Sequence, residues 1–365
     1  MEIFGLIRRA GARRMGALVL AVLLTGLLAG CTRGETDPGA SSSAGEERET
    51  VDELRLEFAP TGGDPETLLQ SLRSLQEKLP AVLAEAGADV HSVTLTVGTS
   101  VSATGQALAE SSVDAALFPT GQALAAFGGE SHVLATRGYA ATLCSGRSPK
   151  DWNTGENAAA DSWTPGQRML ICAGPSEYGQ RLAQRVRDGK DLSWEELRRA
   201  HWAVAGEGQE LAALWLSDTY AGSTLADLPH CTDCGSYEAA LAGLAEETAD
   251  LAVVPADLRI ALADRWTMDP TRTAADGEPG LGRGASVWTE VTVVGVSEPL
   301  YTQTLAAAAE SPWAEEPLAA ALTRALCLLE QDPDFQTLGG SGPLVRLSDP
   351  DLDAARHLAA LEEEP

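Results

Sequence analysis

The chain has 365 residues, which is long enough for two domains, and its hydrophobic content of 44% is that of a globular protein rather than a disordered one. It carries 26 Lys and Arg against 53 Asp and Glu, a formal net charge of -27. A surface this acidic excludes nucleic acid as a partner, because that binding depends on contacts between Lys or Arg and phosphate. It does not exclude a small anion held in a cleft by backbone N–H groups and helix N-termini.

Residues 1–30 have the organisation of a bacterial export signal. Four arginines within residues 8–14 are followed by the apolar stretch Ala17–Gly30, which is shorter than the roughly 20 residues of a membrane-spanning helix. The stretch ends in Leu28-Ala29-Gly30-Cys31, which resembles a lipobox, so we expect Cys31 to be lipidated after export. The alternative is an ordinary signal peptide with a chance cysteine. Removing residues 1–30 leaves 22 basic and 52 acidic residues, a net charge of -30 (22 − 52), and residues 31–50 form a flexible tether.

Five further cysteines follow Cys31, and export permits them to form disulfides. Cys231 and Cys234 form a C-x-x-C pair, which fits a small disulfide, a redox pair or half a zinc site. No second such pair exists, so we expect a structural loop and no metal. Cys144 and Cys172 lie in two strand-like segments, and their pairing is left open.

The first half of the body alternates strands with helices. Alternating apolar residues predict a strand at residues 53–60, and leucines at helical spacing predict a helix over residues 66–87. Further strands are expected at residues 92–98, 113–118 and 131–146, with a short helix at 102–111. This order is typical of an α/β unit with a largely parallel sheet.

The second half repeats this arrangement. It predicts a strand at residues 200–206, helices at 207–222 and 235–247, and a strand-to-helix corner at 248–262. That corner, "ADLAVVPAD", has the form of "VDAALFPTG" at residues 113–121, with Asp250 and Asp114, and Pro255 and Pro119, in equivalent places. The copies lie 136 positions apart (249 − 113), far beyond the period of a solenoid repeat, so they predict two similar α/β lobes. The alternative is that α/β proteins produce such corners by chance.

Ligands of open α/β sheets bind beyond the carboxyl ends of the strands. Both corners lie at such ends, so two facing lobes would present Thr120-Gly121 and Ala256-Asp257 to one shared cleft. Clefts of this kind close on a ligand by hinge motion.

Several segments in this order resemble one family of binding proteins. Residues 59–79 hold a Thr-Gly-Gly-Asp-Pro turn after the first strand, and residues 112–124 hold the first Asp corner. Residues 192–204 contain the Trp segment, and residues 235–259 contain a Ser-Tyr helix start followed by the second Asp corner. The second crossover lies at residues 287–306. From about Leu54 to Leu347 the chain resembles an extracytoplasmic substrate-binding protein of an ABC transporter. The subgroup is the phosphonate/phosphite/phosphate-binding family of type II periplasmic-binding proteins.

The resemblance implies an α/β fold of the periplasmic-binding-protein type II, with two lobes, mixed but mostly parallel sheets and two interlobe crossovers. Lobe one would comprise residues 51–140 and 292–365, and lobe two residues 141–291. Two places depart from the family pattern. Glu207-Gly208-Gln209 replaces a hydroxyl-rich oxyanion loop, and Tyr301-Thr302-Gln303-Thr304 lacks an Asn-Asp pair. A carboxylate at an anion site repels the anion.

The ligand-contact residues are predicted from these corners and from the resemblance. Each has a plainer alternative, which is a turn, a helix cap or core packing. The set is Thr61, Thr120, Gly121, Tyr139, Glu207, Gln209, Ser236, Tyr237, Asp257, Tyr301 and Thr304.

The predicted function is capture of a small anionic or zwitterionic solute, phosphonate-, phosphite- or phosphate-like, and its delivery to an ABC permease. The protein would act as a monomer, without cofactor, metal or catalysis, anchored by lipid at Cys31 on the outer face of the cell membrane. One alternative is a different solute, an amino acid or a thiamine-like compound. Another is a lipid-anchored hydrolase, although the chain has no HExxH, GxSxG or Walker A motif.

Overall fold

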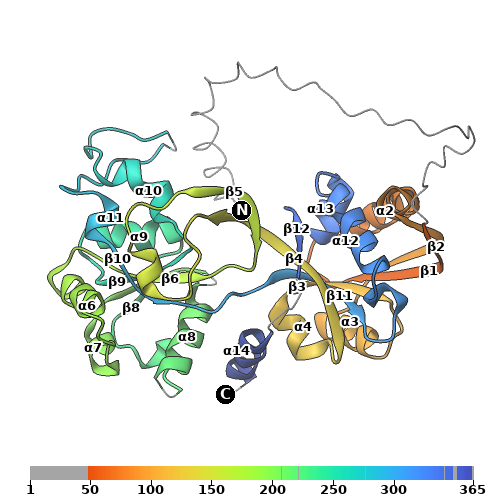
Figure 1. Cartoon of the computed structure of the whole chain (residues 1–365), viewed down its shortest axis with the longest axis horizontal. Coiled ribbons are helices and arrows are strands. Elements are labelled where there is room, and N and C mark those ends of the chain that lie inside the picture. The colour runs from red at the N-terminus through yellow and green to blue at the C-terminus, as the bar shows by residue number, and fades with distance from the viewer. Residues whose placement is uncertain are drawn as a thin grey trace, which may run out of the picture.

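A computed structural model of the chain describes residues 48–206, 208–220, 222–275, 277–340, 342–347 and 352–363. The predicted signal peptide, Cys31 and all but the last residues of the tether lie outside this part, as does Glu207. The described residues form two α/β bodies joined by extended segments (Figure 1). Within them, no helix combines the length and apolar character that a membrane span requires.

Lobe one is built on a sheet whose core follows the order β2-β1-β3-β11-β4. β1, β2 and β3 pair in parallel, while β11 runs antiparallel to both β3 and β4 and is thus the reversed strand of this core. Two more strands, β12 and β5, pair with β4. The strands are β1 (Glu49–Phe58), β2 (Ala88–Val97), β3 (Ala115–Thr120), β4 (Ser131–Thr142), β5 (Ala159–Pro165), β11 (Thr302–Ala308) and β12 (Leu344–Arg346). The helices are α2 (Pro65–Ala86), α3 (Val101–Ala109), α4 (Gly121–Phe127), α12 (Leu318–Leu328) and α13 (Pro333–Gly339).

Lobe two has a sheet in the order β8-β7-β9-β6-β10. Here β7, β8 and β9 pair in parallel and β6 is the reversed strand between β9 and β10. The strands are β6 (Met169–Ala173), β7 (Trp202–Val204), β8 (Cys231–Asp233), β9 (Leu251–Pro255) and β10 (Thr292–Val296). Its helices are α5 (Pro149–Trp152), α6 (Glu177–Arg187), α7 (Trp194–Arg199), α8 (Gly208–Thr219), α9 (Tyr237–Ala245), α10 (Arg259–Trp266) and α11 (Val287–Glu290).

The two sheet cores therefore have the same strand order and the same single reversed strand. Strand by strand, β2, β1, β3, β11 and β4 of lobe one correspond to β8, β7, β9, β6 and β10 of lobe two, and the reversed strands are β11 and β6. The prediction of two similar α/β lobes with mixed sheets is confirmed by this pairing, in which all strands of each core but the reversed one point the same way. The two predicted corners are the ends of β3 and β9, the equivalent third strands.

The lobe boundaries differ from the predicted ones by a strand at each crossover. The segment Thr292–Val296 was expected to open the return to lobe one, but it pairs with β6 and completes the second sheet. The segment Ala159–Pro165 was expected in lobe two, but it pairs with β4 of lobe one. The lobe to which each segment belongs is decided by the strand with which it pairs. Pairing between distant segments cannot be read from the local periodicity of the sequence.

The equivalent aspartates hold equivalent backbone corners. Asp114 Oδ2 accepts a hydrogen bond from the backbone N–H of Arg55 at 2.8 Å, and the Asp114 N–H donates to Arg55 O at 2.9 Å. Asp250 Oδ2 accepts from the backbone N–H of His201, and the Asp250 N–H donates to His201 O, both at 2.8 Å. Each aspartate thus ties the start of the third strand to the first strand of its own lobe.

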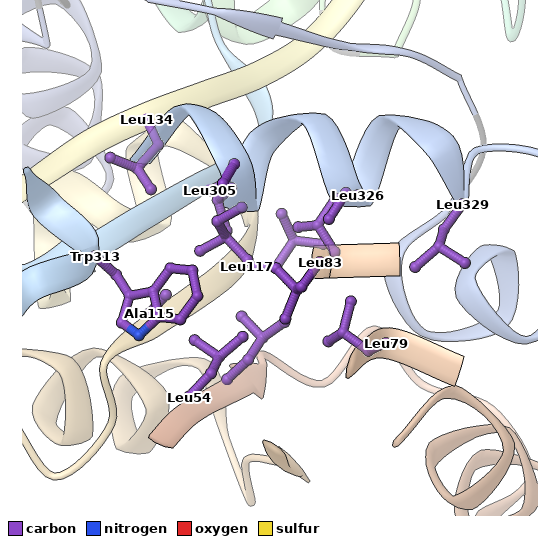
Figure 2. Packing of buried hydrophobic residues seen from close by; sticks show 14 of the residues in the cluster. Leu54, Leu79, Leu83, Ala115, Leu117, Leu134, Leu305, Trp313, Leu326 and Leu329 are labelled. Carbon is purple, nitrogen blue, oxygen red and sulfur yellow. The ribbon is translucent and has the colours of Figure 1, made fainter. Parts of the chain in front are cut away.

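The core of lobe one lies between the sheet and the helices α2 and α12 (Figure 2). Leu75, Leu79 and Leu83 of α2 are fully buried against Leu54 of β1, because their spacing places them on one face of the helix. Trp313 closes one end of this core, and its indole N–H donates to Glu53 O at 3.2 Å. Lobe two has its own buried clusters on the two faces of its sheet, so each lobe has an independent core.

Replacing either aspartate with alanine tests the shared corner. We expect Asp114→Ala and Asp250→Ala each to lower the free energy of unfolding by about 1–3 kcal/mol, because each leaves a backbone N–H without its acceptor. Urea denaturation of each variant measures the loss. Asp264→Ala, an exposed change on α10, serves as the control, and losses no larger than its own would contradict the assigned role.

Candidate functional site

The two crossovers run side by side and are hydrogen-bonded to each other. Gln167 and Leu300 exchange backbone hydrogen bonds, with N–O distances of 2.8 and 3.0 Å. One step further, the Ser297 N–H donates to Met169 O at 2.9 Å and the Met169 N–H donates to Ser297 Oγ at 2.9 Å. The lobes are therefore joined by a short two-stranded hinge, the kind of connection about which domains rotate.

Tyr301 follows this hinge directly and is 8% exposed. Its carbonyl accepts a hydrogen bond from the Gly121 N–H at 2.6 Å. A Cβ at Gly121 would lie 3.0 Å from the Tyr301 Cβ, and one at Gly166, where φ is +69°, would lie 3.0 Å from the tyrosine ring. Both glycines are thus required by the close approach of Tyr301. The Gly121 N–H, predicted to be a ligand donor, is engaged by the crossover.

The other predicted residues of lobe one lie along the same strand ends. Thr120 Oγ1 accepts a hydrogen bond from the Ala123 N–H at 3.0 Å. Thr120 therefore caps α4, which is the alternative to ligand contact given above for this residue. Thr304 Oγ1 donates to Thr302 O at 2.7 Å, and the Tyr139 hydroxyl lies 2.6 Å from Thr302 Oγ1. Thr302 was not predicted as a site residue, because its place beside Tyr139 depends on the pairing of β11 with its neighbours.

Thr61 lies apart from this group. It is exposed in the turn between β1 and α2, next to Gly62, whose φ is +86°. No contact of its side chain with the other predicted residues is seen in the described part of the chain, and its role as a ligand contact stays a prediction.

Lobe two brings its predicted residues together at the carboxyl ends of β7 and β8. The Gly208 N–H at the start of α8 donates to the Tyr237 hydroxyl at 3.1 Å. Ser236 caps α9, and the Gln209 amide donates to Asp233 Oδ2 at 3.0 Å. Glu207 lies outside the described residues. The first N–H of α8 is therefore already paired within the protein.

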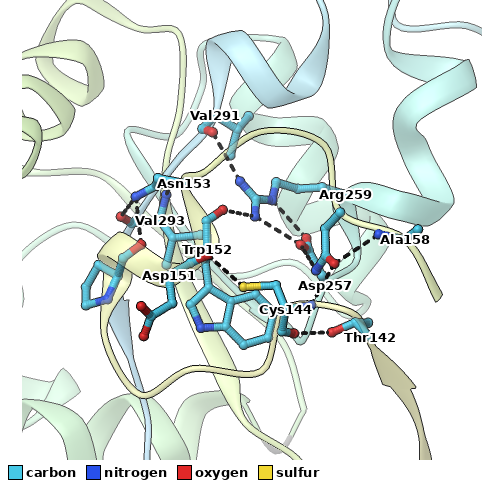
Figure 3. A network of polar contacts seen from close by, with 12 residues as sticks. Thr142, Cys144, Asp151, Trp152, Asn153, Ala158, Asp257, Arg259, Val291 and Val293 are labelled. Atoms are coloured by element: carbon cyan, nitrogen blue, oxygen red, sulfur yellow. Dashed lines mark hydrogen bonds and ion pairs between the residues drawn. The ribbon is translucent and has the colours of Figure 1, made fainter. Parts of the chain in front are cut away.

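Asp257 is placed in a buried ion pair (Figure 3). Its Oδ1 accepts from Arg259 Nε at 2.8 Å, and its Oδ2 accepts from Arg259 Nη2 at 3.0 Å and from Asn157 Nδ2 at 2.8 Å. Both side chains are at most 1% exposed, and Arg259 also donates to Trp152 O at 2.8 Å and lies 4.8 Å from the ring centre of Trp288. Burial, the largest single influence, opposes the guanidinium charge, but the hydrogen bonds that Arg259 donates to Asp257 and the nearby negative charge together outweigh it and raise the pKa of Arg259. The Asp257 oxygens are thus occupied within lobe two.

The cysteines of the described residues are all free thiols. Burial raises the pKa of the Cys172 thiol in β6 to about 12, so it stays protonated and is not a nucleophile. Cys231 and Cys234 are separated by three positions of extended chain, roughly 10 Å, which exceeds the reach of a disulfide. Within the described ranges, no group of three or more His, Cys, Asp or Glu side chains is arranged to hold a metal ion.

A cavity of about 220 Å³ lies beside the hinge, between α8 of lobe two, the second crossover and the C-terminal helix α14 (Asp353–Glu363). Of the predicted residues that the structure describes, only Tyr301 lines it. The other side chains that matter here come from segments far apart in the chain, so no sequence motif marks them: Arg147, Asp218, Glu298, Asp353 and His357.

The cavity wall carries both positively and negatively charged side chains. Asp218 Oδ1 lies 2.8 Å from His357 Nδ1, and Glu298 lies 3.5 Å from Arg168, whose pKa is lowered by burial. Arg147 is exposed and, among the described residues, has no ion pair. The wall therefore offers an unpaired guanidinium together with three carboxylates, a combination that suits a small molecule carrying an acid group and an ammonium group.

The chain matches several solved structures over most of its length at low identity. One is the Mycoplasma hyorhinis protein Mh-p37, named as a candidate thiamine pyrophosphate transporter, with 8% identity, a TM-score of 0.46 and 86% of this chain and 99% of that chain covered. A second is the binding-protein component of an ABC phosphonate transporter from Pseudomonas aeruginosa, with 10% identity, a TM-score of 0.32 and coverage of 86% and 95%. A third is the periplasmic aliphatic sulphonate binding protein SsuA of Escherichia coli, with 14% identity, a TM-score of 0.31 and coverage of 86% and 91%.

No protein-family model matches the chain, and no curated protein matches its sequence. The solved structures that it matches include binding proteins of ABC transporters. The identities and TM-scores are low, so the fold is argued above from the strand order of this chain itself.

Variants of the buried ion pair test whether Asp257 stabilises the fold or contacts a ligand. We expect Asp257→Asn to lower the free energy of unfolding by about 3–5 kcal/mol, because it leaves the Arg259 charge buried without its partner. The double variant Asp257→Asn, Arg259→Met should recover much of that loss, since it removes the orphaned charge as well. Thermal and urea denaturation measure both. A single variant as stable as the wild type would contradict the structural role.

Proposed function

We propose that the protein is the extracytoplasmic solute-binding component of an ABC importer. It would capture a small solute between its lobes and deliver it to a membrane permease. The observation that carries this proposal is the pair of equivalent α/β lobes joined by the hydrogen-bonded hinge, with a charged cavity beside that hinge. Such an arrangement is suited to closing on a ligand and opening again, and it requires no catalytic group.

The charges at the cavity favour a zwitterionic solute over phosphate or a simple phosphonate. The Gly121 N–H at the start of α4 already donates to Tyr301 O, and the Gly208 N–H at the start of α8 already donates within lobe two. A doubly charged anion would meet Arg147 but also the carboxylates of Asp218 and Asp353. In a zwitterion, the acid group would face Arg147 and the ammonium group would face those carboxylates. A volume of about 220 Å³ suits a solute of roughly the size of an amino acid.

The anchoring part of the proposal rests on residues 1–31. The lipobox-like end of the export signal supports lipidation of Cys31, and residues 32–50 supply a polar tether that would let the lobes reach the permease. The protein would then act at the outer face of the cell membrane. No cofactor is required.

A thermal-shift screen tests the binding role and the solute class together. The compounds are amino acids, aminoalkyl phosphonates and sulphonates, thiamine, and the anions phosphate, phosphite and methylphosphonate. We expect a zwitterion to raise the melting temperature, since a ligand at 100 times its Kd stabilises the folded state by about 2.7 kcal/mol. Arg147→Gln should abolish the shift without changing the melting temperature of the free protein, and Arg198→Gln, on an exposed turn of α7, is its control.

The outcomes separate the parts of this proposal. A shift from phosphate or methylphosphonate alone would overturn the zwitterion and retain the binding role. Chemical turnover of a compound, with no ligand that simply binds, would overturn the binding role itself.

Membrane anchoring is tested by Cys31→Ser. We expect this variant to leave the membrane fraction and to lose incorporation of a labelled fatty acid, because it lacks the thiol that carries the lipid. Cys234→Ser, which changes a partly exposed cysteine of lobe two, is the control and should remain lipidated. Retention of the label by Cys31→Ser would refute the lipoprotein assignment.

A further inference from the structure

The C-terminal helix α14 packs on both lobes. It follows β12 of lobe one in the chain, contacts α4 of lobe one on one side and contacts α8 of lobe two on the other. Figure 1 shows it between these two helices, below the strands that join the lobes. Apart from the crossovers, it is the element of the described chain that the figure places between the two bodies.

Two separate apolar stripes of α14 account for this position. Leu352, which precedes the helix, and Ala355 are buried in the lobe-one cluster that contains Phe118 and Leu124. Leu358 is 2% exposed and belongs to the core cluster of lobe two.

Ala354 and Leu361 pack against that same lobe-two cluster. At 100° per residue the two stripes lie about 120° apart around the helix. One stripe would suffice for a helix that belongs to a single lobe, whereas α14 buries apolar surface in two.

Polar contacts add to the lobe-two side. His357 Nδ1 lies 2.8 Å from Asp218 Oδ1 on α8, and His357 Nε2 lies 3.5 Å from Ser217 Oγ on the same helix. Asp353 and His357 also line the cavity beside the hinge. The face of α14 that reaches lobe two is therefore also a wall of the candidate solute cavity.

We propose that α14 is an interlobe latch. Its lobe-one stripe is the permanent attachment, because α14 follows β12 of lobe one in the chain and Leu352 and Ala355 are buried in the lobe-one cluster. Its lobe-two stripe, with the pair of His357 and Asp218, is the releasable attachment. While it is docked, α14 limits rotation about the hinge and encloses one side of the cavity. Release frees the lobes and opens that side.

The latch acts on the proposed solute binding through a shared equilibrium. A solute that contacts Asp353 or His357 binds the docked state more tightly than the released state, and it therefore shifts the population toward docking. By reciprocity, docking favours solute binding by the same factor by which the solute favours docking, and a variant that lowers the docked fraction weakens solute binding in proportion to that fraction. This second consequence rests on the proposed function, but the docking of α14 does not.

Leu358→Ala tests the latch in the absence of any solute. Loss of the buried leucine side chain should weaken the docking equilibrium by about tenfold or more. We expect amide hydrogen exchange in α14 to accelerate by at least about tenfold, and small-angle scattering to show a larger and broader distribution of radii. Exchange in β9 serves as an internal reference for the integrity of lobe two.

Two further variants keep the test decisive. Asp218→Asn weakens the polar contact without removing core volume and should produce a smaller change of the same sign. Ala360→Ser alters an exposed position of α14 and should change nothing. Unchanged exchange in α14 for Leu358→Ala would overturn the latch. Faster exchange in α14 with unchanged scattering would also overturn it, because the helix would then be docked without restraining the lobes.

A solute arm separates this proposal from the proposed function. Where the screen yields a ligand, saturation with it should slow hydrogen exchange in α14, because the ligand shifts the population toward docking, and unchanged exchange would refute coupling of the latch to the cavity. Where the screen yields no ligand, the proposed function fails while the exchange and scattering results still decide the latch.

Discussion

The structure depends on a backbone constraint: neither sheet is complete without a strand that arrives from the other lobe. In lobe one, β11 fills the space between β3 and β4 after the chain has returned from lobe two. In lobe two, β6 plays this part between β9 and β10. Without these strands two edges in each sheet would carry unpaired N–H and C=O groups. The crossovers are thus required by hydrogen bonding, and the hinge at Gln167 and Leu300 is where they meet.

The lobes share a strand order but differ in what their corners do. The β9 corner of lobe two is closed by the pair of Asp257 and Arg259, which faces the lobe interior and stabilises it. The β3 corner of lobe one instead receives Tyr301 against Gly121 and so links the lobe to the hinge. The two corners are therefore equivalent in backbone and unequal in chemistry. The charged cavity lies beside the hinge, and α14 closes one side of it, so solute capture and lobe restraint would use the same few side chains.

Much of the fold was predictable because local patterns carry it. The leucines of α2, the alternation in β1 and the caps Thr120 and Ser236 specify their elements without reference to the rest of the chain. The site was less accessible. Thr302, Arg147 and Asp218 come together only through strand pairing and helix packing, and Asp257 has the same local setting as a ligand residue yet is buried against Arg259.

The sequence by itself determined the two-lobe α/β design, since the repeated Asp and Pro corners are local patterns and their aspartates make equivalent bonds in both lobes. Only the tertiary structure decided which segments belong to which lobe, which N–H groups remain free to meet a ligand, and where the last helix lies. Strand exchange and the docking of α14 join residues separated by more than a hundred positions. The free energy of such contacts depends on complementary surfaces, and a single stretch of sequence contains only one side of each.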